Sequence, residues 1–97
     1  MLTKLPQAEV ETKLEHIGNG WEYCEKHNAI EKEYVRENFL DCVNFIQDIA
    51  MVAEEADHHP DLLLHDYKKL RVTLSTHDAG GITNKDFEVA QSIDKIS

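Results

Sequence analysis

The sequence predicts one α+β domain, in which three helices pack on one face of an antiparallel four-stranded sheet. Two observations carry this prediction. Three segments repeat apolar residues at helical spacing, and four short stretches between them alternate apolar and polar residues, or are wholly apolar, as strands do. The resulting order, helix-strand-strand-helix-strand-strand-helix, is typical of an α+β sandwich. We expect the whole chain, residues 1–97, to form this single domain.

The first helix begins at Pro6, because proline is favoured at the first position of a helix. Its apolar residues at helical spacing are Val10, Leu14 and Ile17. Gly18-Asn19-Gly20 ends it. Residues 21–25 and 29–35 then alternate in polarity on either side of a turn at His27-Asn28, which predicts a β-hairpin.

The strongest helical pattern runs from about residue 36 to residue 57. One apolar stripe contains Phe39, Val43, Ile46, Ala50 and Ala53, and beside it lie Cys42, Phe45, Ile49 and Val52. This arc is wider than one sheet face requires. Two alternatives remain open: the helix is covered entirely within the domain, or it also meets a second subunit. Because a small domain gains proportionally from extra burial, we expect a homodimer or homotetramer joined partly through this helix.

The last third of the chain contains two more strands and a helix. Pro60 ends the long helical segment, residues 62–64 form a short apolar strand, and residues 70–75 alternate in polarity. Gly80-Gly81 breaks the chain before the final helix. Thr83 is expected to cap that helix, with Asp86 at its third position. Its apolar residues are Phe87, Ala90 and Ile93.

Composition limits the classes of partner. The net charge of −9 and the pI near 5.0 argue against nucleic acid and anionic membranes, because both require a basic face. No apolar run approaches the roughly 20 residues that span a bilayer, and the first residues do not resemble a signal peptide. Cys24 and Cys42 have no metal-site spacing and are expected to be free thiols. We expect a cytoplasmic protein that takes a small neutral substrate or a protein partner.

Histidines beside carboxylates indicate proton-transfer chemistry. His58-His59 precedes Pro60, Glu54 lies one helical turn earlier, and His77 follows on a later segment with Asp86 nine positions beyond it. Imidazole has an unperturbed pKa of about 6.5, so it both gives and takes protons near neutrality.

The two adjacent histidines should have different roles, because neighbouring side chains in an extended segment point in opposite directions. His77 should lie at the end of the last strand, a common position for site residues. Asp86 could hydrogen-bond an imidazole, fixing its tautomer and favouring its protonated form, and we pair it with His77.

Other interpretations of these histidines remain open. A histidine pair at a helix end is often a solvated C-cap that interacts favourably with the helix dipole. A zinc site is chemically possible, although neither HExxH nor His-x-His spacing is present. Ser75 and Thr76 lack the glycines of a nucleophile elbow. The remaining histidines, His16, His27 and His65, are expected to be surface residues.

The pattern resembles the signature of the pterin-4a-carbinolamine dehydratases. The residues that carry the resemblance are Glu54, His58-His59-Pro60, Tyr67, His77 and Asp86. Gly20-Trp21, Ala29-Ile30, Phe39 and Leu74-Ser75-Thr76-His77 also resemble the family. Compared with animal members, the stretch between Pro60 and Tyr67 is one residue longer, and a leucine, Leu62 or Leu63, replaces a tryptophan.

The resemblance implies dehydration of 4a-hydroxytetrahydropterin to quinonoid dihydropterin, without metal or organic cofactor, in the service of aromatic amino-acid hydroxylases. It implies that His58 and His77 transfer protons and that His59 orients the substrate. It also implies that Glu54 and Asp86 position these histidines and adjust their affinity for protons. The residues implied to bind substrate are Glu54, His58, His59, Pro60, Thr76, His77, Asp78 and Ala79. Relatives of the family also act as a dimerization cofactor of a homeodomain transcription factor or as RuBisCO assembly chaperones, so a binding role is the rival function.

Overall fold

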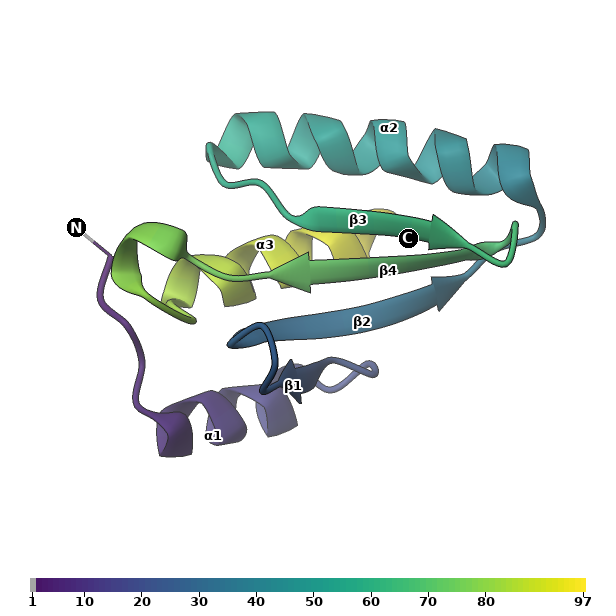
Figure 1. The fold of residues 1–97 in the computed structure, drawn as a ribbon. Coiled ribbons are helices and arrows are strands. Elements are labelled where there is room, and N and C mark those ends of the chain that lie inside the picture. The colour runs from purple at the N-terminus through teal and green to yellow at the C-terminus, as the bar shows by residue number, and fades with distance from the viewer. Residues whose placement is uncertain (1) are drawn as a thin grey trace.

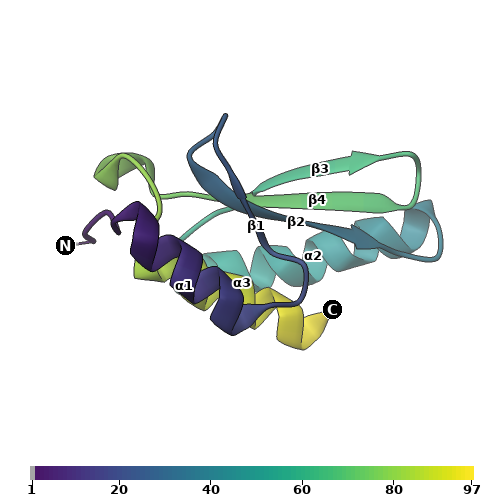
Figure 2. The same ribbon diagram turned by 90° about the horizontal axis from the view of Figure 1, so that it is seen from below.

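The computed structural model describes residues 2–97 and has the predicted order of elements (Figure 1). The elements are α1 (Gln7–Ile17), β1 (Glu22–Cys24), β2 (Ala29–Val35), α2 (Phe39–Ala56), β3 (Asp61–His65), β4 (Lys69–Leu74), a 3₁₀ turn η1 (His77–Ala79) and α3 (Asn84–Ile96). The four strands form one antiparallel sheet in the order β1-β2-β4-β3. All three helices lie on the same side of this sheet (Figure 2), so the predicted α+β class is confirmed.

Strand β4 shows how the sheet separates a core face from an open face. Leu70, Val72 and Leu74 are fully buried against the helices, whereas Arg71 and Thr73 between them point to the open face and remain partly exposed. The core residues contributed by the helices include Val10, Phe45, Ile49, Phe87, Ala90 and Ile93. None of the helices in residues 2–97 combines the length and the apolar character needed to cross a membrane.

Helix α2 differs from its prediction in two respects. It begins at Phe39 rather than near residue 36, because the side chain of Asn38 caps it by accepting from the Asp41 N–H at 2.8 Å. Its apolar arc is also not fully covered within this chain, since Phe39 is 56% exposed and Ala50 is exposed as well. The alternative of a helix covered entirely by its own domain is therefore wrong for the single chain.

Asp94 on α3 connects the helical layer to strand β2 and to Trp21, which precedes β1. Its carboxylate accepts hydrogen bonds from Trp21 Nε1 at 2.9 Å, Lys32 Nζ at 2.8 Å and the Tyr34 hydroxyl at 2.5 Å. Burial alone would raise the pKa of Asp94, but these three bonds, that of Lys32 foremost, outweigh burial and lower it. Burial and the bond to Asp94 raise the pKa of Tyr34. The cluster therefore stabilises the fold through an ionised carboxylate.

Asp94→Asn is expected to lower the free energy of unfolding at neutral pH by about 2 kcal/mol, because an amide replaces a charged acceptor. The pKa of Asp94 is lower in the folded than in the unfolded protein. Its ionised form therefore stabilises the fold above the unfolded-state pKa of about 4, and this stabilisation is lost as pH falls through the lower folded-state pKa. Urea unfolding of both proteins should show a difference that shrinks on acidification. A difference that is independent of pH would show that the charge contributes nothing.

Candidate functional site

The backbone at the end of α2 directs the side chains of His58 and His59 to different environments. Asp57 adopts the left-handed conformation (φ 51°, ψ 43°) and closes the helix, with the His58 N–H donating to the Ala53 carbonyl at 3.1 Å. The His58 side chain is 11% exposed and enters the interior, whereas that of His59 is 57% exposed. The two side chains therefore point to opposite sides, as predicted, and their different roles stay a prediction. The solvated C-cap interpretation is wrong for His58.

His58 contacts a carboxylate that is completely buried. Its Nε2 lies 2.6 Å from Oδ1 of Asp86, whose side chain is 0% exposed. The second oxygen of Asp86 accepts from the Thr83 N–H and from the Thr76 hydroxyl, both at 2.9 Å. The bond from Thr83 is half of the predicted capping box at the start of α3, which is confirmed. Asp86 thus starts a helix and holds a histidine at the same time.

The hydrogen-bond directions around Asp86 are fixed by counting donors. Because the Thr76 hydroxyl donates to Asp86, its oxygen must accept from the Thr83 hydroxyl, 2.8 Å away. When Asp86 is a carboxylate it can only accept, and Nε2 of His58 then carries a proton and donates it to Oδ1. Nδ1 is then the ring nitrogen that remains free to exchange a proton with a ligand.

The structure corrects the predicted partner of Asp86, which is His58 and not His77. The cause is the alternation of strand β4, whose even-numbered residues face the helices. This alternation continues beyond the strand, so Thr76 points inward and bonds Asp86 while His77 is exposed at the next position. The prediction that Asp86 acts through His77 is therefore not supported, because no hydrogen bond joins the two side chains within residues 2–97.

His77, Asp78 and Ala79 form the turn η1 that follows β4. A two-residue bridge closes the loop, with the Thr76 N–H donating to the Gly81 carbonyl at 2.8 Å and the Gly81 N–H returning a bond at 3.3 Å. Gly80 makes the tight return in the left-handed conformation (φ 77°), where a side chain is rarely tolerated. The loop holds His77 at the rim of the open sheet face.

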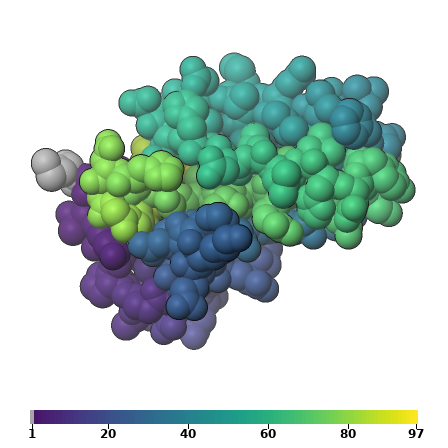
Figure 3. Space-filling model, in the orientation of Figure 1, coloured from purple at the N-terminus to yellow at the C-terminus, as the bar shows by residue number. Residues whose placement is uncertain are grey.

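A pocket of about 80 Å³ on this open face contains both His59 and His77. Its other lining residues are His27, Ala29, Asp61, Thr73 and Ser75. Glu54 lies outside this lining and pairs with Nε2 of His59. Figure 3 looks onto this face, where the β1–β2 turn, the start of β3 and η1 lie side by side.

His27 is exposed, as expected of a surface residue, and it also lines this pocket, a place that the sequence did not indicate. Sequence analysis missed it because the pocket depends on pairing between distant strands. Ile30 of β2 lies opposite Leu74 of β4, so the residues that precede β2 meet those that follow β4. Only the strand order, with β2 beside β4, could have indicated this.

The predicted site residues therefore form two neighbouring groups at one end of the sheet. His58, Thr76 and Asp86 form an inner group, and His59, His77 and Glu54 form an outer one. Larger hollows of about 530 and 440 Å³ lie between α1 and α3 and between α2 and α3, but neither contains more than one histidine. Within residues 2–97, no three His, Cys, Asp or Glu side chains converge as metal ligands would.

The fold and the site thus define a class of small α+β sandwich proteins. Two adjacent histidines lie at a helix–strand junction, and a third follows the last strand. Residues 3–96 match the family described as Pterin 4 alpha carbinolamine dehydratase, and the chain belongs to this family. Proteins named "Putative pterin-4-alpha-carbinolamine dehydratase" from Sulfolobus acidocaldarius and Aquifex aeolicus are each 42% identical to it, over 96% and 99% of this chain and 98% and 93% of theirs.

Two solved structures are also similar. A transcriptional coactivator/pterin dehydratase from Brucella melitensis superposes with a TM-score of 0.87 at 29% identity, covering 97% of this chain and 98% of that one. A pterin dehydratase-like RuBisCO assembly factor of the alpha-carboxysome superposes with a TM-score of 0.65 at 18% identity, over 80% of this chain and 89% of that one. The second likeness concerns the fold alone.

Proposed function

We propose that this protein dehydrates 4a-hydroxytetrahydropterin to quinonoid dihydropterin and water by histidine general acid/base catalysis. The observation that carries the proposal is the buried pair of His58 and Asp86, which leaves Nδ1 of an oriented imidazole free. Membership of the dehydratase family supports the substrate class.

The reaction requires two proton transfers and nothing else. One proton goes to the departing 4a-hydroxyl group as the C4a–O bond breaks, and one leaves the ring nitrogen N5 as the C4a=N5 double bond forms. In this proposal His58 and His77 perform these transfers. Each positioned acid or base contributes roughly 10²–10⁴-fold. His59, which is paired with Glu54, orients the pterin. The remaining proposed substrate contacts are Pro60, Thr76, Asp78 and Ala79.

The direct test follows dehydration of a chemically generated carbinolamine by the purified protein without added metal. We expect acceleration that survives treatment with a chelator, because histidines alone supply the protons. Activity that disappears with the chelator and returns with zinc would replace this mechanism with a metal-dependent one. No acceleration under any condition would refute the activity itself.

The proposed physiological role is recycling of tetrahydropterin in the cytoplasm, because the carbinolamine is the product that an aromatic amino-acid hydroxylase releases at each turnover. A hydroxylase encoded beside this chain would support that link. A neighbourhood of genes for carboxysome proteins would favour the rival assembly role instead.

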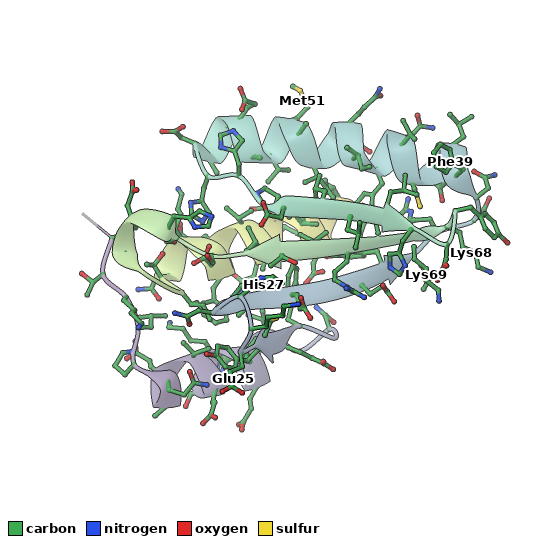
Figure 4. The ribbon with its side chains drawn as sticks, viewed as in Figure 1. Glu25, His27, Phe39, Met51, Lys68 and Lys69 are labelled. Carbon is green, nitrogen blue, oxygen red and sulfur yellow. The ribbon has the colours of Figure 1, made fainter. Side chains whose placement is uncertain are left out.

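We also propose that α2 joins copies of this chain into a dimer or tetramer. The observation that favours self-association is the exposure of Leu40 and Met51 on this helix. Figure 4 shows Met51 projecting from α2 on the side away from the sheet.

Met51→Glu is expected to shift the protein towards monomer at micromolar concentration, because it places a charge on the apolar surface proposed to be shared. Sedimentation velocity measures the shift, with Gln91→Glu, an exposed polar position on α3, as the control. A monomeric wild-type protein, or a Met51→Glu variant that assembles normally, would remove α2 from any interface.

A further inference from the structure

We propose that His27 is a substrate-contacting residue of the outer pocket, and that Asn28 is the positioning residue that holds it there. The inference rests on the proposed function and adds a residue that neither the sequence pattern nor the family resemblance assigns.

The pocket is small and rich in imidazole. Three of its seven lining residues are His27, His59 and His77. Its volume of about 80 Å³ is well below the roughly 300–1,000 Å³ of a typical ligand pocket, so it receives one edge of a bicyclic ring and not the whole ring. A group that enters so narrow a space lies among lining residues that include His27. Figure 4 shows His27 at the β1–β2 turn, beside the start of β2.

The β1–β2 turn is anchored to the loop that carries His77. The Asn28 side chain donates from Nδ2 to the Gly80 carbonyl at 2.9 Å and accepts from the Tyr23 hydroxyl at 3.4 Å. Asn28 is left-handed (φ 47°), a conformation that asparagine tolerates better than most residues. A Cβ added to Gly81 would lie only 2.9 Å from Asn28 Nδ2, which shows how closely the two loops approach. The backbone at His27 is therefore held in place through its neighbour.

A comparison of the hydrogen bonds of His58, His59 and His27 suggests what His27 does. His58 is bonded to Asp86 and His59 is paired with Glu54, whereas the His27 side chain makes no hydrogen bond within residues 2–97. Both nitrogens of the His27 ring are therefore available to a ligand, and the two proton transfers of the proposed reaction are already assigned to His58 and His77. His27 should therefore contribute to binding of substrate and of product alike, and not to the chemical step.

The test compares His27→Ala and His27→Gln with His16→Ala, a matched replacement of an exposed histidine on α1 that lies outside this pocket. For His27→Ala we expect about a five- to tenfold rise in both the KM for carbinolamine and the Kd for 7,8-dihydrobiopterin, the effect of one lost hydrogen bond. kcat should change less than about twofold, because uniform binding is lost. Glutamine should recover part of the affinity, and His16→Ala should change neither constant.

Asn28→Asp removes the donor to Gly80 while keeping the size and the turn preference of the residue. It should raise KM as His27→Ala does, and the double variant should be no worse than His27→Ala alone, because Asn28 acts through His27. A His27→Ala protein indistinguishable from His16→Ala overturns the inference and leaves the proposed function standing. A fall in kcat at unchanged KM overturns the binding role. A wild-type protein that neither dehydrates the carbinolamine nor binds the dihydropterin overturns both proposals.

Discussion

Replacing His58 with alanine is expected to lower kcat for carbinolamine dehydration by about 10²–10⁴-fold, the contribution of one positioned acid or base. The Kd for a dihydropterin should change far less, because the lost interaction is made mainly in the transition state. The structural reason is that, within residues 2–97, His58 is the one histidine whose Nε2 is held by a buried carboxylate, 2.6 Å away. Its ring therefore presents Nδ1 in a fixed orientation.

His58→Gln supplies the matched control for this prediction. A glutamine amide can still donate to Asp86, so the buried carboxylate keeps a partner and the fold should remain as stable as the wild type. Glutamine cannot transfer protons, so its kcat should be as low as that of His58→Ala. A His58→Gln enzyme with near wild-type turnover, or a His58→Ala enzyme that loses only affinity, would show that this ring binds substrate and does no proton transfer.

The features of this protein that sequence predicts are those set by near neighbours in the chain. Hydrophobic periodicity gave the order of helices and strands, and alternation across an extended segment separated His58 from His59. The capping box of Thr83 and Asp86 spans only three positions, and it also was predictable. Even a local prediction can be displaced by a nearby signal. Asn38 caps α2 two residues beyond the predicted start near residue 36.

The features that sequence does not predict depend on contacts between distant segments. Asp86 meets His58 because the end of α2 reaches the start of α3, and 28 positions separate the two residues. Spacing in the sequence brought Asp86 closer to His77, and the pairing of those two was inferred on that basis. His27 joins the outer pocket only because β2 pairs with β4. Local patterns find the side chains of a site more readily than its geometry.

Asp86→Asn is expected to lower kcat by at least about 10²-fold while leaving the fold intact. The Thr83 N–H and the Thr76 hydroxyl both donate to Oδ2 and need an acceptor. The amide oxygen of the variant should therefore occupy the position of Oδ2. The amide NH₂ group then faces Nε2 of His58 and forces the proton onto Nδ1. The imidazole is thereby held in the opposite tautomer, with no free base at the substrate.

Double replacements decide which histidine Asp86 serves. If it acts through His58, then His58→Ala with Asp86→Asn should lower kcat little more than His58→Ala alone, because residues that act as a unit are not additive. His77→Ala with Asp86→Asn should instead multiply the two single losses, since no contact joins those side chains in residues 2–97. Thermal unfolding of each variant checks that the loss is catalytic. The reverse pattern, additive with His58 and non-additive with His77, would restore the pairing suggested by sequence spacing and would contradict the role assigned to the buried pair.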